Sequence, residues 1–220
     1  YAALDAVCTF LLFQKFEKPL LTNERLYGVY RDILIPGCRF LTDIQDIGVP
    51  FDKERLEKSS VLMQENIDEA ITTLYTYPEI KKFEEITGKD FNPNSTMQLR
   101  SLLFDYLGLT PTGKKTGTGA DSTDAEVLKE LAEEHEVPQL VLDIRQKVKI
   151  KSTYLDKIYP QLDRDSRLRT GFNLHGTTSG RLSSSGKMNM QQIPRDNPIV
   201  KGCIKAAPGN KIVAMDLTTA

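Results

Sequence analysis

The chain has 220 residues, of which 40% are hydrophobic and 27% are charged, as in an ordinary folded globular protein. This length suffices for one large domain or two small ones. No hydrophobic run approaches the roughly 18 residues that a membrane-spanning helix needs, and the first residues lack a signal-peptide pattern. We therefore expect no membrane segment. Because the sequence lacks an initial Met and stops inside a hydrophobic segment, we expect a piece of a longer protein.

The net charge of −1 conceals an uneven distribution. Residues 141–205 contain 13 Lys or Arg and 5 Asp or Glu, whereas the remainder contains 16 and 25. This basic segment favours a surface for a polyanion and, equally, a solvated helix face balanced elsewhere in the fold. Three widely spaced cysteines, Cys8, Cys38 and Cys203, and two histidines form no disulfide framework or zinc motif, so we expect a reducing compartment.

The first three quarters of the chain are expected to be helical. Hydrophobic periodicity predicts helices over residues 1–20 and 24–46, with a kink at Pro36. Asp52 is expected to cap a further helix, in which hydrophobic residues recur at helical spacing as far as Leu74.

Two capping boxes are predicted farther along. Ser95 pairs with Gln98, and Thr123 pairs with Glu126, each at the three-residue spacing of the motif. A long helix is expected over residues 138–162, with its proline in the first turn.

The last part of the chain changes character. Residues 168–174 and 211–216 have the composition of short strands. The sequence therefore predicts a mainly α fold, followed by the start of an α/β region with a few antiparallel strands.

Three motifs in this last part carry the clearest functional signal. Thr177–Ser184 reads TTSGRLSS, Asn189–Pro194 reads NMQQIP, and Val213–Leu217 reads VAMDL. Together they resemble family A DNA polymerases, in which T-x-T-G-R-L-S-S and P-N-L-Q-N-I-P precede a strand that ends in a catalytic Asp. This chain has one more residue than usual between the first two motifs and Met188 in place of the usual Pro, so the resemblance leaves the path of this loop open.

Earlier segments extend the resemblance over nearly the whole chain. FNPNSTMQL from Phe91, the segment that follows Ser122, and RQKVKIKSTY from Arg145 resemble the thumb of the family. YAALD from Tyr1 resembles the third motif of its 3′–5′ proofreading exonuclease. The implied domains are the end of the exonuclease, a helical thumb and the first part of the palm, which we place at residues 1–22, 23–165 and 166–220.

The resemblance implies part of a DNA-directed DNA polymerase that acts in DNA replication and repair in the cytoplasm of a bacterial or phage-infected cell. Its partners would be primer–template DNA and deoxynucleoside triphosphates, and it leaves any processivity factor unidentified. Its cofactor would be Mg²⁺, with two ions in the polymerase site and two in the exonuclease site. The fingers and the second palm carboxylate are not in this sequence, so we expect the fragment alone to be inactive.

Catalytic and metal-binding roles follow from the matched motifs. Asp216 would bind both polymerase metals with help from the carbonyl of Leu217, since Mg²⁺ prefers oxygen ligands. Lys201 would lie near the incoming nucleotide. In the exonuclease motif, Asp5 would bind a metal and Tyr1 would orient the attacking water. A plain strand-end Asp is the structural alternative for Asp216.

DNA-contacting roles are implied for polar and basic residues. Arg181 would probe the minor-groove acceptors that all correct base pairs share, with Asn189 and Gln191 nearby on the duplex. Hydroxyl, amide and cationic groups of the thumb would bind phosphates. These thumb residues are Asn92, Ser95, Ser122, Thr123, Arg145, Lys149 and Lys151.

Simpler structural roles stay open for several of these residues. Arg181 could be an ion-pair partner, Ser95 and Thr123 could be helix caps, and Lys151 could belong to a solvated face. At the level of the whole chain, the alternatives are a non-catalytic DNA-binding module derived from such a polymerase and a helical protein–protein adaptor. The adaptor predicts no salt-dependent affinity for DNA, whereas phosphate contacts predict affinity that falls steeply with salt.

Overall fold

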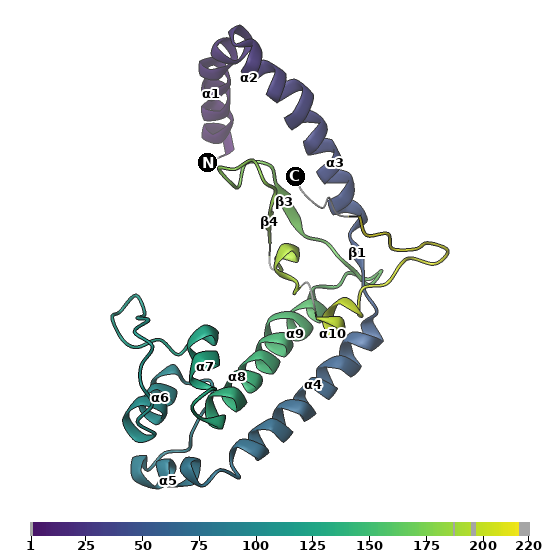
Figure 1. Ribbon diagram of the computed structural model, residues 1–220. Coiled ribbons are helices and arrows are strands. Elements are labelled where there is room, and N and C mark those ends of the chain that lie inside the picture. The colour runs from purple at the N-terminus through teal and green to yellow at the C-terminus, as the bar shows by residue number, and fades with distance from the viewer. Residues whose placement is uncertain (1, 187, 195–196, 216–220) are drawn as a thin grey trace. The chain divides into compact units, whose positions relative to one another are not determined.

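The structure is a computed structural model that describes residues 2–186, 188–194 and 197–215. It divides into two compact units (Figure 1). The first unit comprises residues 1–50 and 162–193, and the second comprises residues 51–161 and 194–220. The domain bounds expected from the resemblance stay a prediction, because compactness alone does not mark the domains of a longer protein. None of the described helices is long and apolar enough to cross a membrane.

The first unit begins with the helices α1 (Ala2–Thr22), α2 (Glu24–Val29) and α3 (Ile35–Ile47). Asn23 caps α2 because its side chain accepts a hydrogen bond from the backbone N–H of Leu26. Both predicted helices are thus confirmed.

A π-helical segment, Tyr30–Leu34, joins α2 to α3 just before Pro36, and the kink expected at Pro36 stays a prediction. The N–H of Ile35 bonds to the carbonyl of Tyr30, five residues back. Proline has no N–H with which to continue the regular ladder, so a local widening of the helix just before Pro36 agrees with its chemistry.

Two small antiparallel sheets complete the first unit. β1 (Val49–Pro50) pairs with β2 (Arg167–Leu168), and β3 (Gly171–Asn173) pairs with β4 (Ser183–Ser185). A short 3₁₀ turn, Met190–Gln192, follows β4. The predicted mainly α fold with a few antiparallel strands is confirmed.

The strand expected over residues 211–216 is wrong for the part that the structure describes. Residues 211–215 form no strand, and the side chains of Val213 and Met215 are 73% and 91% exposed. A strand requires a partner that accepts its backbone hydrogen bonds, and no described strand lies beside this segment. The other run, residues 168–174, is extended as predicted but is divided between β2 and β3.

The second unit is built on two long antiparallel helices that lie side by side, α4 (Lys53–Leu74) and α8 (Glu136–Lys149) (Figure 1). Asp52 caps α4 as predicted and accepts a hydrogen bond from the N–H of Arg55. α8 continues through a π-helical segment, Ile150–Leu155, into α9 (Asp156–Ile158) and a 3₁₀ turn, Tyr159–Gln161. The long helix predicted from residue 138 is therefore present, and it starts two residues earlier.

Shorter helices pack at the far end of this pair. They are α5 (Pro78–Thr87), α6 (Thr96–Arg100) with its π-helical continuation Ser101–Tyr106, and α7 (Ala125–Leu131). A last short helix, α10 (Pro198–Lys201), follows near the end of the chain.

The hydrophobic core of the second unit joins α5, α6, α7 and α8 to the end of α4. The rings of Phe83 and Phe91 meet edge to face with centroids 5.9 Å apart. The core consists of Leu74, Ile80, Phe83, Phe91, Leu99, Leu102, Leu103, Val127, Leu128, Leu131, Val137, Val141, Leu142 and Ile144. Because these side chains come from six segments of the chain, the core fixes the loops between them.

Of the two predicted capping boxes, the structure contains the Ser95 cap but neither complete box. Ser95 caps α6 by accepting from the N–H of Gln98, but the Gln98 side chain bonds to Asn92 and Asp90 and does not return to Ser95. Thr123 is not a cap. Asp124 caps α7 and accepts from the N–H groups of its second and third residues, Glu126 and Val127. A carboxylate accepts such bonds at a helix N-terminus more strongly than a neutral hydroxyl.

We predict that Leu128→Ala lowers the free energy of unfolding by about 2–5 kcal/mol, because it leaves a cavity among fully buried side chains. Leu62→Ala, on an exposed position of α4, should change it by less than about 0.5 kcal/mol. Urea denaturation of both variants checks this, and equal effects would contradict the described core.

Candidate nucleic-acid interface

A polar hollow opens beside α6, α7 and α8 in the second unit. Its volume is about 410 Å³, and each residue that lines it has a side chain with a hydroxyl or a charged group. The lining residues are Thr96, Arg100, Thr116, Thr118, Ser122, Thr123, Asp124 and Arg145. Three of the predicted thumb residues, Ser122, Thr123 and Arg145, thus meet here although 23 positions separate the first from the last.

Arg145 connects the loops around this hollow. Its Nε donates to the carbonyl of Pro93 at 2.8 Å, and its Nη1 donates to the carbonyl of Thr123 at 2.9 Å. Its Nη2 is buried and has no partner among the described residues. Burial lowers the pKa of the Arg145 guanidinium, but the group keeps its proton at any ordinary pH. The third nitrogen therefore remains a cationic donor beside a hollow that is rich in hydroxyl groups.

Ser122 and Thr123 are held in place by the backbone. Both residues are buried, with 7% and 5% of their surface exposed. The N–H of Ser122 donates to the carbonyl of Lys114, and the Ser122 hydroxyl accepts from the N–H of Asp124. Ser122 thus has a local structural role, whatever ligand it also meets.

Lys114 is neutralised within the protein. Its ammonium lies 2.8 Å from Asp124 and 2.5 Å from Glu126. The hydrogen bond from Lys114 is the main cause that lowers the pKa of Asp124 to about 2, and the N–H of Val127 adds to it. This lysine braces the basic loop 110–122 against the first turn of α7.

The remaining thumb candidates are exposed or paired. Asn92 accepts from the N–H of Asn94 and closes the turn before α6. Lys149 is exposed near the end of α8. Lys151 forms an ion pair of 2.8 Å with Asp156, whose other oxygen accepts from Ser60.

Sequence reasoning missed Thr96 and Arg100 in this hollow. Arg100 also donates to the carbonyl of Asp121 and thereby ties α6 to the loop before α7. The available signal was their spacing of four residues on the helix that Ser95 starts, which places both side chains on one face.

Arg181 lies in the first unit, just before β4, and is exposed. In the part of the chain that the structure describes, no side chain pairs with its guanidinium. Its own carbonyl accepts from the hydroxyl of Thr177 at 2.6 Å, which closes the turn. The ion-pair alternative for Arg181 therefore has no support from the described residues.

Asn189 and Gln191 come from the 3₁₀ turn region beside Arg181, as the sequence suggested. Gln191 donates to the carbonyl of Leu182 at 2.9 Å and accepts from the N–H of Ser184 at 2.8 Å. Asn189 accepts from the N–H of Gln191 and from the hydroxyl of Ser184. Both amides thus support the strand that Arg181 precedes.

The other predicted catalytic positions are only partly described. Asp5 is exposed on α1, and Lys201 is exposed at the end of α10. Tyr1, Asp216 and Leu217 lie outside the described residues. Within the described ranges, no three His, Cys, Asp or Glu side chains gather as a metal site would require. The single carboxylate of Asp5 does not make such a site.

Comparison with known proteins identifies the family. The sequence model of DNA polymerase family A matches residues 60–219, and the chain therefore belongs to DNA polymerase family A. This assignment agrees with the mainly α fold that leads into small antiparallel sheets.

Individual relatives are close over nearly the whole chain. It is similar to the DNA polymerase of Escherichia phage T5, with 52% identity over 220 residues that cover all of this chain and 26% of the relative. It is 35% identical over 214 residues to the thermostable DNA polymerase I of Thermus thermophilus, covering 93% of this chain and 24% of the relative. The chain thus spans about a quarter of the length of these relatives.

A solved structure shares the fold. The POL domain of Pol1 from M. smegmatis, in complex with DNA primer-template and dNTP, matches with a TM-score of 0.77 and 27% identity. The match covers 94% of this chain and 35% of that chain.

We predict that Asp124→Asn flattens the pH dependence of stability on the acid side. The pKa of Asp124 is about 2 in the folded state against about 4 in the unfolded state, so its contribution is complete above pH 4. The contribution is lost as the pH falls through 4 toward 2. Urea unfolding between pH 2 and 7 measures the change.

Asp105→Asn is the matched control, because Asp105 is exposed and accepts no hydrogen bond among the described residues. A wild-type acid slope in Asp124→Asn would contradict the ion pair with Lys114.

Proposed function

We propose that this chain is the part of a DNA-directed DNA polymerase that grips primer–template DNA and begins the palm. The whole protein would carry out template-directed nucleotidyl transfer from deoxynucleoside triphosphates in DNA replication and repair. The family match over residues 60–219 carries this proposal. The chain alone would be inactive, because the fingers and a second palm carboxylate would come from the rest of the polymerase.

Residues 51–161 of the second unit belong to the proposed thumb, which spans residues 23–165. Its hollow is lined by side chains that carry hydroxyl groups and by Arg100 and Arg145, of which Arg145 has its Nη2 buried and without a partner among the described residues. Hydroxyl and guanidinium donors of this kind bind phosphate oxygens without reading sequence, as a replicative enzyme needs. Asn92 and Ser95 would contribute from the turn before α6, and Lys149 and Lys151 from the end of α8.

The first unit would hold Arg181 against the primer end. Purine N3 and pyrimidine O2 lie at similar minor-groove positions in every correct base pair, so one exposed guanidinium can test all of them. Asn189 and Gln191 would lie nearby on the duplex, and Lys201 near the incoming nucleotide.

The metal-binding and proofreading roles also remain proposals. When bound, two Mg²⁺ ions would stabilise the charge that develops in nucleotidyl transfer. Asp216 with the carbonyl of Leu217 would hold them in the polymerase site, and Asp5 with Tyr1 would serve a 3′–5′ exonuclease site in the longer protein, which we place in the cytoplasm.

We predict that Asp216→Ala in the full-length polymerase slows primer extension by at least about a thousandfold, since a metal ligand supports several kcal/mol of charge stabilisation. Extension with Mg²⁺ and all four deoxynucleotides measures this, with Asp105→Ala as the control. Equal extension by variant and wild type would show that the active site is misplaced. A folded parent that binds primer–template but never extends it would indicate a non-catalytic DNA-binding module.

We further predict that DNA affinity falls steeply with salt. Lys149→Ala should reduce the slope of log affinity against log salt by about one, because one phosphate contact is lost. Lys82→Ala, at an exposed position of α5, should leave the slope unchanged. Fluorescence anisotropy of the full-length protein on primer–template, from 50 to 300 mM salt, tests this. An affinity for DNA that does not change with salt concentration would favour a protein–protein adaptor.

A further inference from the structure

The β3–β4 hairpin that leads to Arg181 has no neighbouring strand on either edge in the described structure. A two-stranded hairpin is marginally stable by itself, so its geometry depends on what its edges contact. The central pair of this hairpin is Phe172 opposite Ser184. Both of their N–H groups point away from the partner strand, as in a non-hydrogen-bonded pair.

Each of these outward N–H groups is bound by a glutamine side chain. The N–H of Phe172 donates to Oε1 of Gln45 on α3 at 3.0 Å, and the N–H of Ser184 donates to Oε1 of Gln191 at 2.8 Å. The two amides therefore take the place of neighbouring strands. The Gln45 bond matters more for placement, because it joins the hairpin to a long helix, whereas Gln191 follows the hairpin in the chain.

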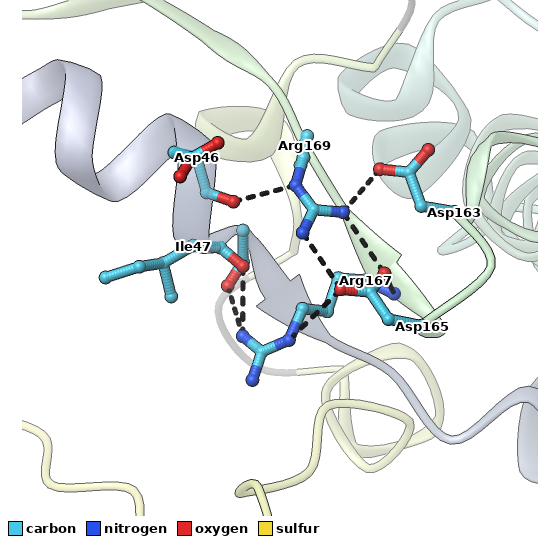
Figure 2. Close-up of polar contacts among 7 residues, drawn as sticks. Asp46, Ile47, Asp163, Asp165, Arg167 and Arg169 are labelled. Carbon is cyan, nitrogen blue, oxygen red and sulfur yellow. Dashed lines mark hydrogen bonds and ion pairs between the residues drawn. The ribbon is translucent and has the colours of Figure 1, made fainter.

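The end of α3 is bonded to β2 and to the residues between β2 and β3 (Figure 2). Arg169 donates to the carbonyl of Asp46 at 2.8 Å and binds Asp165 through both terminal nitrogens, and it also contacts Asp163. Arg167 donates to the carbonyls of Ile47 and Gly48. These cations meet the carbonyls that a helix C-terminus leaves unpaired.

The backbone at Gly48 also lies close to the side chain of Arg169. Gly48 has φ of +64°, and a Cβ there would lie 2.8 Å from Cγ of Arg169. A residue with a side chain would therefore be strained and would also push Arg169 away. Near the start of α3, a Cβ at Gly37 would lie 3.3 Å from the side chain of Leu174, which directly follows β3. Close approaches therefore lie on both sides of Gln45, at Gly37 and at Gly48.

We infer that Gln45 is a positioning residue for Arg181. It acts through β3: its side chain holds the Phe172 N–H, β3 pairs with β4, and β4 begins two residues after Arg181. The inference rests on the proposed function of Arg181 as a minor-groove probe. The end of α3 would thus fix the position of the hairpin, and with it Arg181, relative to the primer terminus.

The test uses the full-length polymerase and single-turnover extension of two primers. One primer ends in a normal purine, and the other ends in its 3-deaza analogue, which lacks the N3 acceptor that Arg181 would contact. Wild type should extend the analogue more slowly, and Arg181→Ala should extend both primers at one slow rate. Gln45→Ala should lower extension of the normal primer about tenfold, the cost of one partly buried hydrogen bond, and leave the analogue nearly unchanged.

Three further variants separate positioning from stability. Gln45→Glu keeps an acceptor oxygen and should restore most of the difference between the primers. Gln45→Met keeps the length and packing without the acceptor, and it replaces Gln45→Ala if that variant fails to fold. Gln14→Ala, at an exposed position of α1, is the matched control and should behave as wild type. Combined with Arg181→Ala, Gln45→Met should cause no further loss.

Two results would overturn the inference alone: wild-type rates in Gln45→Met, or an equal loss on both primers. A wild type that extends both primers equally, with no effect of Arg181→Ala, would instead overturn the proposed role of Arg181 and the inference with it. Hydrogen exchange of the Phe172 amide, measured in the same variants, should accelerate in Gln45→Met and not in Gln45→Glu. Unchanged exchange would show that Gln45 does not hold the strand.

Discussion

The polar face of the second unit depends on the half-buried guanidinium of Arg145. Taking a charged group partly out of water is costly unless hydrogen bonds compensate, and Arg145 obtains them from the carbonyls of Pro93 and Thr123. Through these two bonds, one side chain of α8 fixes the turn before α6 and the loop before α7. The hydroxyl-lined hollow exists because these loops are held together. Arg145, which is expected to bind phosphate, therefore also holds together the loops that line the hollow.

The first unit uses the same chemistry at another place. Arg167 and Arg169 donate to the carbonyls at the end of α3 and pair with carboxylates of the turn before β2 (Figure 2). The hydrogen bond from Arg169 lowers the pKa of Asp165, so this carboxylate stays charged to a lower pH than an unpaired aspartate. Several basic side chains of residues 141–205 thus bind carbonyl and carboxylate groups of the protein itself. Lys151, Arg167 and Arg169 are paired with carboxylates of the same segment, while Arg181, Lys149 and Lys201 remain exposed.

Local signals in the sequence predicted several helix starts, because a cap is decided by a few adjacent residues. Asp52 and Ser95 show this, since each accepts from the N–H three residues later. Thr123 shows the limit of such reasoning. Thr123 and Asp124 are both good caps, and spacing alone favoured the wrong one. The choice of Asp124 depends on Lys114, which arrives from the preceding loop and pairs with the carboxylate.

By itself, the sequence determined the family, the mainly α fold and the set of polar residues that the motifs single out. These properties follow from short-range patterns: periodicity, caps and motif spacing. Only the tertiary structure decided which of those residues meet in one hollow and which of the basic residues are used internally. It also brought Gln45 to the N–H of Phe172, 127 positions away. Contacts of that range depend on how whole elements pack, and no local pattern encodes them.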